Sequence, residues 1–153
     1  MLHYEDIVVG AKSRFGRYEV TREEVVKFAR KYDPQAFHLD EEAAAATHFG
    51  RLSASGWHTC AMTMAMIIGN MKLRPEAGLG SPGVDELRWS RPVYPGDTLS
   101  VENEVLSKRR SRSRRDMGLL KSRTRTFNQH GEVVLDMIAN TLIQVRDPGA
   151  PID

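Results

Sequence analysis

One segment of this 153-residue chain, residues 55–71, is apolar around most of its circumference if it forms a helix. A helix without a polar face has to be covered on nearly every side. A chain of this length buries roughly two thirds of its unfolded surface, so a single core can supply that cover. The sequence therefore predicts a central helix that the rest of one domain, residues 1–153, surrounds. The apolar members of the segment include Trp57, Cys60, Ala61, Met64, Ala65, Ile67 and Ile68.

The residues on either side of this segment follow different periods. Thr21 followed by Glu24 is a capping-box start for a helix that should end at Asp33-Pro34. Asp40 should cap a second, short helix reaching Thr47. After the Pro/Gly-rich stretch 74–83, which we expect to be a loop, the apolar period changes to two, as in strands. The predicted strands are residues 84–89, 99–105, 118–127 and 133–145, with a hairpin turn at 128–131.

These elements predict an α+β fold in which one antiparallel sheet faces one very apolar helix. The arrangement is compatible with a hotdog fold, a curled antiparallel β-sheet wrapped around a long central apolar helix. The pattern alone is equally compatible with an α+β sandwich of another topology.

Composition excludes several classes of protein. The single cysteine, Cys60, rules out an internal disulfide framework and a cysteine-cluster zinc site, and the five histidines contain no H-x(3)-H pair, so we expect no metal. The first ten residues do not resemble a signal peptide. The densest apolar stretch, residues 60–68, is about half of a membrane span. We therefore expect a cytoplasmic protein that does not enter a membrane.

The loop 32–40 contains a carboxylate and an imidazole, Asp33 and His38, between two predicted helices. Such a pair can converge on one point and share a water molecule, as general acid/base chemistry on a small substrate requires. The spacing by itself favours a simpler interpretation, in which Asp33 caps a turn and His38 packs as a partly buried ring.

The pair and its surroundings resemble a known family. Asp33 and His38, followed by Leu39-Asp40, Phe49-Gly50 and Ser55-Gly56, resemble the signature of the MaoC-like dehydratase, or (R)-specific enoyl-CoA hydratase (hydratase 2), family. The segment 91–99, R-P-V-Y-P-G-D-T-L, is similar to a strand entrance common in that family. The loop departs from the family pattern, with Tyr32 for its glycine and Gln35 for its asparagine.

The resemblance implies a hotdog fold and reversible hydration of a trans-2-enoyl-CoA thioester to a 3-hydroxyacyl-CoA. Asp33 would be the base that activates water and His38 the proton donor, although these roles could be reversed. Gly56, with Ser55 beside it, would bind the thioester oxygen, since a helix start offers free amide hydrogens. His58 is expected to be a core or interface histidine. No cofactor is implied, because coenzyme A is part of the substrate, and a homodimer joined through sheet edges is expected.

Basic residues cluster in the run 108–115, while the rest of the chain has more acidic than basic residues. The run has no interleaved aromatic residues, which argues against nucleic acid as the partner. By the resemblance, Arg112, Arg114 and Arg115 could contact the phosphates of coenzyme A; a solvated hairpin explains them equally well. Two other functions stay open: a hotdog acyl-CoA thioesterase, which the D-x(4)-H spacing disfavours, and a non-catalytic acyl-CoA-binding module.

Overall fold

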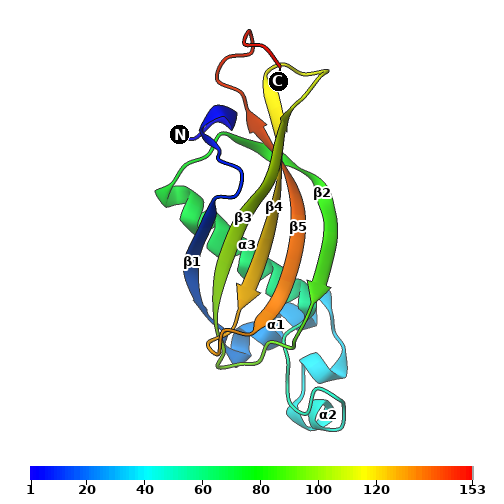
Figure 1. Ribbon diagram of the computed structural model, residues 1–153. Helices are drawn as coiled ribbons and strands as arrows, with labels where there is room; N and C mark the ends of the chain where they lie inside the picture. Colours follow the sequence, from blue (N-terminus) through cyan, green and yellow to red (C-terminus); the bar gives the residue numbers. More distant parts are fainter. Residues whose placement is uncertain (153) are drawn as a thin grey trace.

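The computed structural model describes residues 1–152, with the backbone alone for Leu73. A five-stranded antiparallel sheet, in the order β1-β3-β4-β5-β2, curls around one long helix, α3 (Gly56–Leu73) (Figure 1). This confirms the α+β class and the hotdog arrangement. None of the helices in residues 1–152 is long and apolar enough to cross a membrane. The strands are β1 (Lys12–Glu19), β2 (Gly78–Trp89), β3 (Thr98–Arg110), β4 (Met117–Phe127) and β5 (Val133–Gln144).

The two predicted capping residues start the short helices. The Thr21 hydroxyl accepts a hydrogen bond from the Glu24 amide (3.2 Å) at the start of α1 (Arg22–Tyr32). The capping box is not completed at this helix start, and the Glu24 carboxylate accepts a hydrogen bond from the Tyr18 hydroxyl. Asp40 accepts from the Ala43 amide (2.8 Å) at the start of α2 (Glu41–Ala45), which is shorter than predicted. Two 3-10 turns, η1 (Tyr4–Asp6) and η2 (Ala36–His38), complete the helical elements.

The main core lies between α3 and the concave face of the sheet. Met62 and Met66 of α3 are 1% and 6% exposed and pack against Leu99 and Val101 of β3. β1 approaches α3 closely at Gly16, where an added Cβ would lie 2.6 Å from the Met66 sulfur and where φ is +83°. The other buried members of this cluster are Val20, Val25, Leu52, Ala54, Val93 and Val134.

The expectation that α3 is covered on nearly every side is wrong for a single chain. Trp57, Met64 and Ile68 are 60%, 49% and 45% exposed, and Ala61 and Ala65 between them are also exposed. These residues recur at helical spacing on the side of α3 that the chain's own sheet does not cover. One set of apolar side chains of α3 therefore lies in the core, and another set lies on the surface.

The sheet also contains more chain than the sequence predicts. β2 begins at Gly78, inside the expected loop, and pairs with β5 through register shifts around Gly80 and Gly83, whose φ values are +108° and +152°. β1 was not predicted, because a register irregularity between Phe15 and Tyr18 interrupts its alternation. Glycines and bulges let these strands pair although their sequences lack a regular period.

Candidate functional site

The structure brings Asp33 and His38 together. Asp33 is the C-cap residue of α1 and His38 closes η2, so the turn between these elements places both side chains at the start of α3. The His38 Nε2 atom lies 3.5 Å from Asp33 Oδ2, and the two side chains are only 7% and 19% exposed. The pair is thus close, nearly buried and separated by slightly more than a direct hydrogen bond.

A backbone contact fixes the orientation of the His38 ring. Its Nδ1 atom lies 2.7 Å from the carbonyl oxygen of Ser53. A carbonyl oxygen only accepts, so Nδ1 must hold a proton and donate it. The other ring nitrogen, Nε2, is thereby the atom presented to Asp33.

The carboxylate of Asp33 is held by two further donors. The Gln35 side-chain amide donates to Oδ1 and the Ser55 hydroxyl donates to Oδ2, each at 2.7 Å. Burial raises the pKa of Asp33, but the hydrogen bonds from Gln35 and Ser55 and the attraction of His38 outweigh it, so the pKa is below its ordinary value. Asp33 is therefore ionised at neutral pH. Gln35, one of the departures from the family pattern, takes part in this arrangement, a role that sequence reasoning missed.

Ser55 leaves the start of α3 uncapped by a side chain. It is the N-cap residue, yet its hydroxyl donates to Asp33 and accepts no hydrogen bond from the helix. Among the residues described, the amides of Gly56, Trp57 and His58 have no backbone acceptor, and the first bond at this end runs from Thr59 to Ser55. Free amides at the positive end of a helix favour an anion. The predicted pair of Ser55 and Gly56 thus lies beside Asp33 and His38.

Gly56 also has a packing role that the sequence does not reveal. A Cβ atom at this position would lie 2.6 Å from Cε2 of Trp89, the last residue of β2. The Trp89 indole donates through Nε1 to the Gly56 carbonyl oxygen (2.9 Å). The absence of a side chain at Gly56 therefore makes room for the indole ring.

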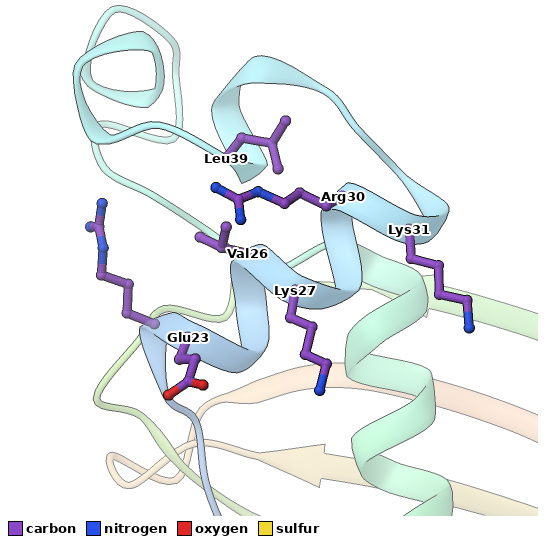
Figure 2. A pocket seen from close by; sticks show the side chains of 7 residues that line it. Glu23, Val26, Lys27, Arg30, Lys31 and Leu39 are labelled. Carbon is purple, nitrogen blue, oxygen red and sulfur yellow. The ribbon is translucent and has the colours of Figure 1, made fainter.

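A cavity of about 370 Å³ extends from His38 to the start of α3, and Asp33 is not among the residues that line it. His38 and Gly56 both line it, together with Phe49, Thr59 and Trp89. A larger hollow of about 940 Å³ lies along the outer side of α1 and is lined by neither Asp33 nor His38 (Figure 2). The smaller cavity is the candidate active site, because His38 and Gly56 line it and Asp33 lies 3.5 Å from His38.

A second titratable cluster surrounds His58. Its side chain is 3% exposed, stacks on the Phe28 ring (centroids 4.6 Å apart) and places Nε2 3.8 Å from Glu24 Oε1. Burial lowers the pKa of His58 although Glu24 opposes it, while burial and Glu24 raise the pKa of Tyr18 to about 12. His58 is buried as expected, but its Nδ1 has no hydrogen-bond partner among the described residues.

The basic hairpin is not part of this site within one chain. Arg112, Arg114 and Arg115 lie in the turn between β3 and β4, beyond the Arg110–Gly118 pair. The start of β3, Thr98, instead pairs with Glu19 next to α1, so the arginines and the Asp33 site are at opposite ends of the sheet (Figure 1). Arg114 is also engaged by both carboxylate oxygens of Asp116, at 3.0 and 2.9 Å.

Comparisons with known proteins agree with the geometry. Residues 7–125 match the family model described as MaoC like domain. The crystal structure of a MaoC-like dehydratase from Rhodospirillum rubrum is 40% identical, covers 96% of this chain and 99% of its own, and superimposes with a TM-score of 0.86. The R-hydratase PhaJ1 from Pseudomonas aeruginosa is 27% identical over 99% of this chain and 95% of its own, with a TM-score of 0.68.

A curated relative, mesaconyl-CoA hydratase from Cereibacter sphaeroides, is 41% identical over 69 residues. The match spans 45% of this chain but only 20% of that longer protein. Dehydratases and hydratases thus recur among the similar proteins, in support of a hydro-lyase type of activity. The family match over most of the chain and the close structural likeness lead to one conclusion: this protein belongs to the MaoC-like domain family.

Proposed function

We propose that this protein is a hydro-lyase that adds water reversibly to a trans-2-enoyl-CoA, with Asp33 and His38 as its acid/base pair. The observation that carries the proposal is the 3.5 Å approach of His38 Nε2 to Asp33 Oδ2, with the ring orientation set by the Ser53 carbonyl. Gly56, whose amide has no backbone acceptor among the described residues, lines the same cavity as His38. A base, an acid and an oxyanion site are the groups that the reaction needs.

The proposed reaction starts with a water molecule beside the ionised Asp33. The carboxylate removes a proton from the water as its oxygen forms a bond to C3 of the enoyl group. The electron pair of the C2–C3 double bond moves toward the thioester carbonyl and produces an enolate. His38 then gives a proton from Nε2 to C2, and the proton held by Asp33 returns to His38 or to solvent before the next turnover.

The enolate oxygen requires hydrogen-bond donors in a site that excludes water. We assign this role to the amide of Gly56 at the start of α3, where the helix dipole favours negative charge. Ser55 acts indirectly: its hydroxyl donates to Asp33 and leaves the helix amides free for the substrate. Loss of one such donor in an enzyme lowers the rate by about a hundredfold or more.

We further propose that the protein acts as a homodimer joined through β2. This strand is at the edge of the sheet, and its Leu79 and Val84 are 45% and 49% exposed. The uncovered side of α3 is a second exposed apolar surface, on which Trp57 and Met64 are 60% and 49% exposed. An apolar edge strand of this kind needs a partner. Sedimentation at micromolar concentration should give the mass of a dimer, and a monomer there would contradict this part of the proposal.

The hydratase proposal is tested by the loss of the enoyl thioester chromophore of crotonyl-CoA. Asp33→Asn and His38→Gln should each reduce the rate by two or more orders of magnitude, as is typical for removal of acid/base catalysis. Asp40→Asn and His130→Gln are matched controls, because Asp40 only caps α2 and His130 lies in an exposed turn. Undiminished turnover in Asp33→Asn would refute the mechanism. Release of thiol from saturated acyl-CoA thioesters without hydration would instead indicate a thioesterase.

A further inference from the structure

We infer that the large groove along the outer side of α1 binds the phosphate-bearing nucleotide of the CoA thioester, with Arg30 as its central contact. The inference rests on the function proposed above. The groove has a volume of about 940 Å³ and lies between α1 and the residue that follows His38, Leu39 (Figure 2). A hollow of this volume is at the upper end of the range of small-molecule and cofactor sites, about 300–1,000 Å³.

The charges of the groove are mostly positive and only partly compensated. Arg22, Lys27, Arg30 and Lys31 line it, against one acidic residue, Glu23. Arg22 is already paired with Glu41, at 3.0 Å. Within residues 1–152, no ion pair to a carboxylate involves Lys27 or Arg30. The groove therefore keeps positive charge available for an anion from solution.

Arg30 is better placed to bind a phosphate in the groove than Lys27 or Lys31. Its side chain extends toward Leu39 and passes close to Val26, whereas Lys27 and Lys31, which also line the groove, extend away from Leu39 (Figure 2). Val26 and Leu39 are half-buried and form an apolar floor. A guanidinium group can donate two parallel hydrogen bonds to a phosphate, and an apolar floor can cover one face of a purine.

The groove is also close in the chain to the proposed chemistry. Arg30 precedes Asp33 by three residues, which is about 4.5 Å along a helix axis. Leu39 directly follows His38. The flexible arm of coenzyme A would thus join two neighbouring parts of one segment. The hairpin arginines, represented by Arg112, are instead at the opposite end of the sheet.

The same cations have a simpler structural explanation. Arg30 and Lys31 are in the last turn of α1, where the helix dipole favours positive charge. That explanation predicts an effect of Arg30 on stability but none that depends on the nucleotide of the substrate. Lys72, in the last turn of α3, is a matched control, because it has the same relation to its own helix.

The test compares two substrates, crotonyl-CoA and crotonyl-N-acetylcysteamine, which has the same thioester but no nucleotide. Arg30→Glu should raise the KM for crotonyl-CoA about tenfold, equivalent to about 1.4 kcal/mol, with kcat nearly unchanged. The KM of Arg30→Glu for the short thioester should stay at the wild-type value. In Lys72→Glu, the KM for each of the two substrates should stay at the wild-type value. Arg30→Gln should give a smaller effect of the same kind, and serves if the charge reversal prevents folding. Added salt should raise the KM for crotonyl-CoA in the wild type and in Lys72→Glu, which both keep Arg30, and should leave their KM for the short thioester unchanged.

Three results would overturn the inference: an unchanged KM for crotonyl-CoA in Arg30→Glu, an equal change for both substrates, or a larger selective effect in Arg112→Glu. If the wild type hydrates neither thioester, the proposed function fails separately. Titration with free coenzyme A then decides about the groove: binding that Arg30→Glu weakens about tenfold supports it, and absent or unchanged binding contradicts it.

Discussion

The contact between Gly56 and Trp89 predicts that Gly56→Ala destabilises the fold independently of any role in catalysis. The added methyl group would lie 2.6 Å from Cε2 and 2.8 Å from Cδ2 and Nε1 of the indole, closer than non-bonded atoms can approach. The ring must move, and its hydrogen bond to the Gly56 carbonyl is then lost. Overpacking of this kind costs about 1–3 kcal/mol. Trp89 is 43% exposed, so the ring can swing outward and the cost should stay within that range.

A cost of this size should lower the Tm by about 2–4 °C per kcal/mol in a domain of this length. Thermal unfolding and urea titration of Gly56→Ala measure the change directly. The decisive comparison is a double-mutant cycle with Trp89→Ala, which removes the obstacle. In that background Gly56→Ala should be neutral or slightly stabilising, because alanine is the better helix former. A loss of stability that is equal with and without the indole would refute the reasoning.

Three further predictions concern other buried or charged groups. Thr63→Val should lower the free energy of unfolding by about 1–3 kcal/mol, because it leaves the fully buried hydroxyl of Thr126, 2.7 Å from that of Thr63, without a hydrogen-bond partner. In urea titrations, the double variant with Thr126→Val should recover most of this loss. The hydrogen bonds of Arg14 and Arg125 lower the pKa of Glu102. The ionised Glu102 therefore stabilises the folded state fully above the ordinary pKa of a glutamate, and this stabilisation is lost as the pH falls through the lowered pKa. Acid unfolding of Glu102→Gln should depend less on pH than that of the wild type. In the hydration assay, the acid limb of the pH–rate profile should lie below the ordinary pKa of an aspartate and should move to higher pH in Gln35→Ala, and an unmoved limb would contradict the hydrogen-bond assignment.

The sequence by itself determined the elements whose signals are local. Thr21 and Asp40 act on amides three residues away, and both cap the helices that they were predicted to start. The apolar segment forms α3, and the alternating residues that follow form β3 to β5. The approach of Asp33 to His38 could be predicted because the two residues are five positions apart in a recognisable pattern, and a short loop can bring such a pair together without help from distant parts of the chain.

Only the tertiary structure decided the surroundings of the site. Ser55 donates to a carboxylate 22 residues away rather than capping its own helix, and Trp89 packs on Gly56 from the far edge of the sheet. The opposite placement of Arg112 and the uncovered side of α3 likewise follow from strand order and register. Caps and periodicity express interactions between residues a few positions apart. The partners of a side chain across 20 or more residues depend on how the whole sheet closes around its helix, and no local pattern encodes that.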